Sequence, residues 1–250
     1  MFVYTLNPLA IKKFTITLIA FFATLTLFAH KADTIKTTNS HVVIHFIGHG
    51  TLMLEYNGKV FHIDPWSRVA NYDSLPKADA VLLTHHHQDH LDSIALAKVF
   101  TNDTELYWTE TCAKLSKFKA NGKVIANGNT FSVLGVTVKA VPAYNIVNKR
   151  NNGEPYHIKG EGNGYILNID NTTIYIAGDT ENIPEMAEFG KIDIAFLPMN
   201  IPFTMTPEMV KDAVLTLKPR ILYPYHYGKT DTNLIVELLK DFKNLEVRIR

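Results

Sequence analysis

Residues 80–92 read AVLLTHHHQDHLD, an apolar run joined directly to a cluster of imidazole and carboxylate side chains. The apolar run predicts a strand that is buried on both faces. If the chain leaves this strand in extended form, His85 and His87 point the same way, because side chains alternate with a period of two. Asp89 and His90 then turn inward as the next helix begins. Three imidazoles and a carboxylate around one small volume favour Zn²⁺ or a neighbouring divalent ion.

The composition is that of an ordinary globular protein, and it leaves histidine and carboxylate side chains as the metal ligands. The 250 residues are 46% hydrophobic and 20% charged, with 25 Lys and Arg against 24 Asp and Glu. This balance argues against a nucleic-acid partner, since there is no positive excess to neutralise phosphates. The single cysteine, Cys112, excludes an internal disulfide and a Cys-rich zinc site, whereas eleven histidines are available.

The first 29 residues are expected to be an export signal rather than part of the fold. Lys12 and Lys13 precede a continuous uncharged and largely apolar run from Phe14 to Ala29. This run is shorter than the roughly 20 residues of a membrane-spanning helix and suits the apolar region of a secretory signal. We expect a signal peptide over residues 1–29, a linker over 30–40 and one folded domain over 41–250, located in the periplasm or secreted. An uncleaved N-terminal membrane anchor is the alternative.

From residue 41 onward, short apolar runs alternate with turn residues, which is typical of strands joined by tight turns. Asn57-Gly58 predicts a hairpin between strands at 51–56 and 59–64, and Asn171 marks another between 164–170 and 172–179. Helices are expected over 93–100, 110–119, 184–189, 206–217 and 233–242. Further strands are expected over 41–47, 80–85, 105–109, 123–126, 130–134, 136–142, 192–199, 220–226 and 245–250. This order indicates an α+β sandwich of two sheets packed face to face, with helices outside.

With His-x-His-x-Asp-His at residues 85–90, the chain resembles the metallo-β-lactamase superfamily from about residue 41 to its carboxyl terminus. Gly178-Asp179-Thr180 and Pro224-Tyr225-His226 follow in the order found there. The resemblance implies a four-layer αββα sandwich of two mixed β-sheets flanked by helices. In such proteins the later Asp bridges two metals and the last His completes the second site. The implied metal ligands are His85, His87, Asp89, His90, Asp179 and His226.

Three weaker strings resemble the branch of L-ascorbate-6-phosphate lactonase-like metal-dependent hydrolases. They are GHGT at 48–51, IDPW at 63–66 and AGDT at 177–180. At the ends of early strands, His49 and Asp64 are candidates for orienting the ligand imidazoles. A turn histidine and a strand-terminal aspartate without that role are the alternative. The iron-carrying redox branch of the superfamily generally has Glu where His87 stands, so the nitrogen-rich site favours hydrolysis.

One ligand that the superfamily usually provides is missing from this chain. The third histidine of the first metal follows a strand in the middle of the chain, and here the corresponding string at 141–145 reads VPAYN. Tyr144 or Asn145 stands in its place. Three outcomes are open: a single-metal site, a dinuclear site in which His157 swings in from the long loop, or a first site filled only with substrate. A surface loop histidine is the alternative for His157.

These observations predict a metal-dependent hydrolase that cleaves an ester, lactone or phosphodiester. One or two Zn²⁺ ions are the expected cofactor, with Mn²⁺ or Fe²⁺ as alternatives, because such ions acidify bound water. Asp89 is expected to orient this water or accept its proton, and Tyr144 to donate to the developing oxyanion. The substrate is expected to be a small molecule contacted by His157 and Lys159, and basic residues of the 145–163 segment favour a negatively charged one. A catalytically weak metal-binding envelope protein of the same fold is the alternative.

Overall fold

The computed structural model describes residues 31–250, which form two seven-stranded sheets. Residues 1–30, and with them the expected signal peptide, lie outside the described residues. The first sheet contains, in chain order, β1 (Ala32–Lys36), β2 (His41–Gly48), β3 (Thr51–Tyr56), β4 (Lys59–Ile63), β5 (Ala80–Leu82), β6 (Glu105–Trp108) and β7 (Lys123–Val124). The second contains β8 (Thr130–Val133), β9 (Val136–Ala143), β10 (Gly162–Ile169), β11 (Thr172–Ile176), β12 (Ile194–Pro198), β13 (Ile221–Tyr225) and β14 (Glu246–Val247).

The two sheets have the same order of antiparallel and parallel strands, and in each sheet this order places several strand ends at one edge. β2, β3 and β4 are antiparallel neighbours, and β4, β5 and β6 are parallel. In the second sheet β9, β10 and β11 are antiparallel, and β11, β12 and β13 are parallel. The turn after β2, the loop after β9 and the carboxyl ends of β4, β5, β11, β12 and β13 therefore lie at one edge of their sheets. The two edges meet, because the backbone N–H of His226 donates to the carbonyl of His49 (3.1 Å).

Side chains of the buried strands alternate between the core that the sheets share and the outer layers. In β11, Ile174 and Ile176 pack between the sheets, whereas Tyr175 packs on the outer side. In β12, Phe196 belongs to the shared core and Ala195 to the outer layer. This alternation follows from the period of two in a strand, and it explains why these strands are apolar throughout.

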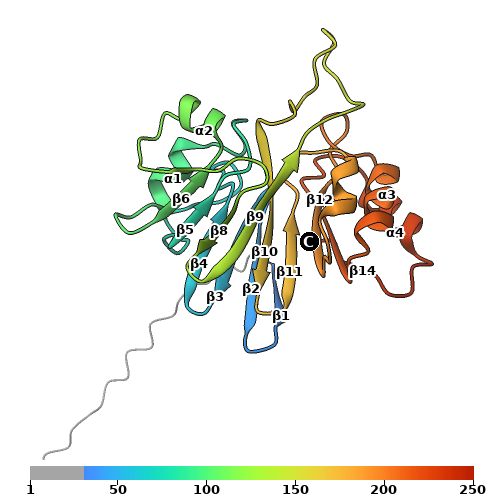
Figure 1. Ribbon diagram of the computed structural model, residues 1–250, viewed down its shortest axis with the longest axis horizontal. Helices are drawn as coiled ribbons and strands as arrows, with labels where there is room; N and C mark the ends of the chain where they lie inside the picture. The colour runs from blue at the N-terminus through green and yellow to red at the C-terminus, as the bar shows by residue number, and fades with distance from the viewer. Residues whose placement is uncertain (1–30) are drawn as a thin grey trace, which may run out of the picture.

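Helices cover both outer faces: α1 (Ser93–Val99), α2 (Glu110–Leu115), the 3-10 helix η1 (Pro184–Glu188), α3 (Pro207–Leu217) and α4 (Thr232–Leu239). α1 and α2 pack on the first sheet, and α3 and α4 on the second (Figure 1). α3 begins where the sequence predicts, because the Thr206 side chain accepts from the backbone N–H of Met209 (3.2 Å) and Pro207 occupies the first helical position. The expected four-layer αββα sandwich is confirmed.

Several expectations about the sheets need correction, since the strands expected over 123–126 and 245–250 are reduced to β7 and β14. The segment 30–40, expected to be a linker, contains β1, which pairs with β2 along its whole length. Only Ile35 of this strand is buried, so its composition does not distinguish it from a linker. The strand expected over 80–85 ends at Leu82, because the carboxylate of Asp64, rather than a neighbouring strand, accepts from the backbone N–H of Thr84 (2.7 Å). Within residues 31–250, no helix is both long and apolar enough to cross a membrane.

The carboxylate of Asp33 on β1 ties the first sheet to the last strands of the second. It accepts from the hydroxyl of Tyr223 (2.6 Å) and from the guanidinium groups of Arg248 (3.0 Å) and Arg250 (2.8 Å). Burial raises the pKa of Asp33, but the hydrogen bonds from Arg250, Tyr223 and Arg248 outweigh burial and lower it below its usual value. The charged form of Asp33 therefore stabilises the fold.

We predict that Asp33→Asn lowers the free energy of unfolding at pH 7 by about 1.5–3 kcal/mol, the range for hydrogen bonds to a charged group. A lowered pKa gives stability that is present above the unfolded pKa of about 3.9 and is lost as pH falls through the folded pKa. The difference between the variant and the wild type should therefore shrink below about pH 4. Urea unfolding of both proteins at pH 7 and in acid measures this difference in the free energy of unfolding. Asp103→Asn, an exposed matched control, should change little, and an equal loss in both variants would contradict the prediction.

Candidate metal centre

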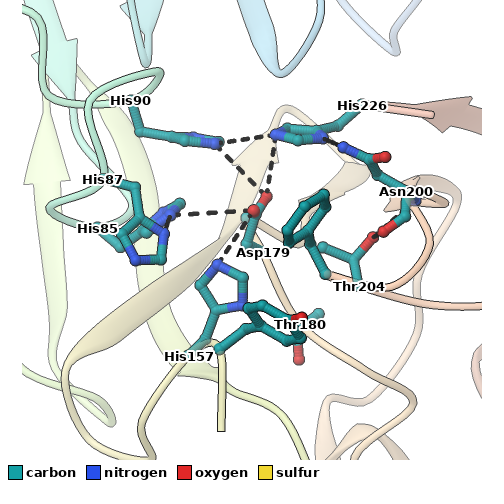
Figure 2. Close-up of polar contacts among 12 residues, drawn as sticks. His85, His87, His90, His157, Asp179, Thr180, Asn200, Thr204 and His226 are labelled. Carbon is teal, nitrogen blue, oxygen red and sulfur yellow. Dashed lines mark hydrogen bonds and ion pairs between the residues drawn. The ribbon is translucent and has the colours of Figure 1, made fainter. Parts of the chain in front are cut away.

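The strand ends of both sheets surround a cavity of about 500 Å³. Its lining includes six side chains able to bind a metal, which are His49, His87, Asp89, His157, Asp179 and His226. His85 and His90 are buried next to them. Figure 2 shows the rings of His85, His90, His157 and His226 around the carboxylate of Asp179.

A first group of ligand atoms consists of three histidines. The ring nitrogens of His85, His87 and His157 lie within 4.8 Å of one another, and Nε2 of His85 is 3.1 Å from Nδ1 of His87. His85 and His87 follow β5, whereas His157 belongs to the long loop between β9 and β10. His157 is buried, so it is not the surface loop histidine that the sequence also allowed. Of the three outcomes left open by the missing histidine, the arrangement matches the one in which His157 joins the first group.

A second group lies beside the first. Nε2 of His226 is 3.3 Å from Oδ2 of Asp89 and 3.2 Å from Nε2 of His90. Nε2 of His90 is 3.6 Å from the same oxygen of Asp89. Asp89 and His90 follow β5, and His226 follows β13. This group therefore joins the two sheets.

Asp179 lies between the two groups and turns one oxygen toward each. Its Oδ2 is 3.2 Å from Nε2 of His157 and 3.9 Å from Nε2 of His85. Its Oδ1 is 3.5 Å from Nε2 of His90 and 3.6 Å from Nε2 of His226. A carboxylate with this orientation can serve both groups at once.

The donor set fits divalent cations. Nε2 of His157 and Oδ1 of Asp179 are buried and have no hydrogen-bond partner among residues 31–250. A buried polar atom without a partner costs about 1–3 kcal/mol, and a cation in the group that each atom faces would remove that cost. Imidazole nitrogens with carboxylate oxygens are the ligand types of Zn²⁺ and its neighbours. The residues present are therefore able to bind a metal in each group.

Polar partners orient the imidazoles from behind. Asp64 accepts from Nδ1 of His90 (2.8 Å) and from the hydroxyl of Thr84 (2.6 Å). Because that hydroxyl donates to Asp64, it accepts from Nδ1 of His85 (3.0 Å). Both contacts place the ring proton on Nδ1 and direct Nε2 toward the cluster, as outer partners of metal-binding histidines do. His49 instead contacts the carboxylate, with its Nε2 2.9 Å from Oδ2 of Asp89.

Burial and neighbouring charge shift the pKa values of the cluster in opposite directions. Burial, with a smaller effect from His90, lowers the pKa of His85 well below its usual value, and burial with His157 lowers the pKa of His87 to about 4. Burial also acts to lower the pKa of His90, but Asp179 and Asp64 outweigh it and raise the pKa to about 10. His85 and His87 are therefore neutral at pH 7, the form in which imidazole binds a metal.

The two carboxylates of the cluster remain charged at neutral pH. Burial acts to raise the pKa of Asp89, but hydrogen bonds from His226 and His49 outweigh burial and hold this pKa well below its usual range. Burial likewise raises the pKa of Asp179, and the neighbouring His226 and His90 hold it well below the usual range. Two anions, the buried Asp179 and the half-buried Asp89, attract positive charge, either as a proton on His90 or as a metal cation.

The backbone is strained at three residues of the site. His49, Asp64 and His226 have positive φ angles of 55°, 46° and 46°, which cost of order 1–3 kcal/mol each and concentrate at functional sites.

Gly50 allows the two sheet edges to approach, because a Cβ there would lie 2.9 Å from ring atoms of both His90 and His226.

Two predicted site residues lie elsewhere. The hydroxyl of Tyr144 is 2.9 Å from Oε2 of Glu185, and Nζ of Lys159 is 2.6 Å from Oε1 of the same residue. Neither Tyr144 nor Lys159 lines the cavity, so the expected oxyanion and substrate contacts are not formed. The carboxylate of Glu185 draws both groups away. His157, expected to contact substrate, lines the cavity and also belongs to the first ligand group.

Other residues at the site have weak sequence signals. Arg68 and Asn200 line the cavity, and the amide of Asn200 contacts Nδ1 of His226 (3.3 Å). Asn145 contacts Nδ1 of His157 (2.6 Å). Of these, Asn145 alone was marked by the sequence, since it stands where a histidine was expected.

Comparisons with known proteins agree with this fold. The family described as "Beta-lactamase superfamily domain" matches residues 43–226. A UPF0173 metal-dependent hydrolase of Thermococcus kodakarensis is 33% identical over 202 residues, which cover 75% of this chain and 85% of that relative. One of Lysinibacillus sphaericus is 32% identical over 222 residues, covering 82% and 95%.

Solved structures give the same result. A protein of Parabacteroides distasonis ascribed to the metal-dependent hydrolases has 44% identity and a TM-score of 0.83, with 89% of this chain and 99% of that chain covered. A diiron beta-hydroxylase of Streptomyces venezuelae shares the fold alone, at 16% identity and a TM-score of 0.66, covering 83% and 52%. This chain belongs to the beta-lactamase superfamily and, within it, to the metal-dependent hydrolases.

Proposed function

We propose that this protein is a dinuclear hydrolase that cleaves an ester, lactone or phosphodiester bond in a small anionic molecule. The observation that carries the proposal is the position of Asp179, whose two oxygens face two groups of side chains able to bind a metal, beside an open cavity. His85, His87 and His157 would hold one ion, and Asp89, His90 and His226 the other, with Asp179 between them. Zn²⁺ is the proposed metal, and Mn²⁺ or Fe²⁺ suits the same ligands.

When bound, such ions acidify a water molecule and polarise the substrate oxygen. Asp89 is the residue suited to orient this water, because its side chain is 30% exposed and lines the cavity. The contact between its Oδ2 and Nε2 of His49 keeps this carboxylate charged and fixed in place. The more deeply buried Asp179 lacks this access to solvent.

The cavity walls favour a substrate with a negative charge and an apolar part. Arg68 and Arg150 line the cavity, and among residues 31–250 neither lies within ion-pair distance of a carboxylate. Arg150 stacks on the ring of Tyr156, with the guanidinium carbon 5.0 Å from the ring centroid. Trp66 and Phe203 supply apolar surface. The two guanidinium groups are therefore available to an anion.

The alternative, a catalytically weak metal-binding protein, rests on the missing third histidine. The position of His157 weakens that argument, because three imidazoles are present in the first group. Metal binding without hydrolysis of any ester, lactone or phosphodiester would favour this alternative.

We predict that the metal-loaded protein hydrolyses at least one of three probes, namely bis(p-nitrophenyl) phosphate, a γ-lactone and p-nitrophenyl acetate. Asp89→Ala should lower the rate by about 10²-fold or more, the usual cost of losing the position of a reacting group. A chelator should abolish the rate, and added Zn²⁺ or Mn²⁺ should restore it. Asp103→Ala, an exposed control, should retain the wild-type rate. Full activity of Asp89→Ala would disprove this mechanism.

We further predict that the arginines select the charged member of a matched substrate pair. Arg68→Gln and Arg150→Gln should each lower kcat/KM for p-nitrophenyl hemisuccinate by about 10-fold or more, since a charged hydrogen bond contributes about 1.5–3 kcal/mol. The neutral p-nitrophenyl butyrate should change little. Lys159→Gln, outside the cavity, is the control for loss of a positive charge. An equal decrease in kcat/KM for both esters would show that the arginines do not select the negatively charged substrate.

A further inference from the structure

Glu181 is a buried carboxylate near the metal centre that the proposed chemistry does not use. Its side chain does not line the cavity, and it is 1% exposed. All of its partners are hydrogen-bond donors at the start of the loop that carries His157. They are the backbone N–H groups of Ile146 (2.7 Å), Val147 (2.7 Å) and Asn148 (2.7 Å), and the side-chain amide of Asn145 (3.1 Å).

These contacts determine which way the amide of Asn145 points. Its Nδ2 donates to Oε1 of Glu181 and to the carbonyl of Phe203 (3.0 Å), and both of these are acceptors only. The opposite end, Oδ1, therefore faces His157, where it accepts from the backbone N–H (2.9 Å) and from Nδ1 of the ring (2.6 Å). An amide turned by 180° would bring its NH₂ group against the donors of His157.

The orientation of Asn145 in turn determines the proton position on His157. An acceptor 2.6 Å from Nδ1 keeps the ring proton on that nitrogen. Nε2 then carries a lone pair, and it is this atom that lies in the cluster, 3.2 Å from Oδ2 of Asp179. Asn145 thus holds the proton on Nδ1 of His157, just as Asp64 does for His90 and Thr84 does for His85.

We propose that Glu181 is a positioning residue that, through Asn145, fixes the tautomer and orientation of His157 and so completes the three-histidine group. The proposal rests on the proposed metal site. It also assigns a role to Asn145, which orients a ligand instead of being one.

The requirement is for a carboxylate and not merely for a side chain of this size. Both oxygens of Glu181 face donors, two at Oε1 and two at Oε2. In Glu181→Gln, either orientation of the amide places an NH₂ group against two N–H groups. The isosteric change should therefore release Asn145 and the loop, although the volume of the side chain is unchanged.

The first test uses ¹⁵N-histidine NMR of the metal-free protein, which observes the Nδ1 proton of His157 directly. In the wild type this proton should be present, hydrogen-bonded and slow to exchange, and Glu181→Gln should lose it. Glu185→Gln, a nearby control whose carboxylate contacts Tyr144 and Lys159, should keep it. The Nδ1 proton of His90, held by Asp64, should persist in every variant and reports an intact cluster.

Asn145→Ala is the second variant, and it keeps the result interpretable if Glu181→Gln does not fold. It removes the acceptor of His157 but leaves Glu181 with its three backbone donors. The same loss of the His157 Nδ1 proton is expected. If that proton remains with wild-type exchange in Asn145→Ala, or in folded Glu181→Gln, the proposal is overturned.

A Zn²⁺ competition titration gives the second readout. Glu181→Gln and Asn145→Ala should weaken one of two sites by about 10–100-fold, the usual cost of losing an outer partner, and Glu185→Gln should weaken neither. Unchanged affinity at both sites would contradict the proposal. Neither readout uses catalysis, so absence of hydrolysis would refute the proposed function while leaving this test intact.

Discussion

The two oxygens of Asp179 lie buried between two groups of imidazole nitrogens, and the rest of the site is arranged around this carboxylate. Its charge is costly in the protein interior unless cations or donors surround it. The structure brings ligands from the ends of β5 and β13 and from the β9–β10 loop to the same place. Both sheets have the same order of antiparallel and parallel strands, so their parallel strands end at edges that meet. Each sheet can therefore supply side chains to the cluster around Asp179.

Orientation of the ligands depends on side chains that face away from the cavity. Asp64 lies at the end of β4 with strained backbone and holds His90 and, through Thr84, His85. Asn145 holds His157 in the same way from the other sheet. Asp64 was expected in this role from the sequence, whereas Asn145 was marked only because it stands where a histidine was expected. Both decide which ring nitrogen faces the cluster. The positive φ angle of Asp64 lowers the stability of the fold but places its carboxylate against His90 and Thr84.

The periodicity of the sequence predicted most of the fold. Alternation and turn residues located the hairpins around Asn57 and Asn171, and Thr206 with Pro207 located α3, because these signals are local. β1 was missed, since an edge strand with one buried side chain has the composition of a linker. The end of β5 was misplaced because a side chain, Asp64, takes the place of a strand partner, and such a contact between distant residues is invisible to a local pattern.

The candidate site shows the same division between local and distant information. The six residues of the recognised motifs lie together as the resemblance implied. His157, by contrast, joins His85 and His87 from a position in the loop where no ligand was expected by the resemblance, and the fold of residues 145–148 onto Glu181 accompanies this. Tyr144 was expected at the cavity because it stands near the missing ligand, but the charged Glu185 holds its hydroxyl elsewhere. Proximity in sequence was a poor guide within a loop of this length.

Anomalous diffraction from crystals of the Zn²⁺-loaded protein tests the central claim most directly. The account predicts two zinc peaks, one on each side of Asp179. One should lie about 2.0–2.1 Å from a ring nitrogen of each of His85, His87 and His157, the normal Zn–N distance. A single peak bound by Asp89, His90 and His226, with His157 turned away from the metal, would contradict it.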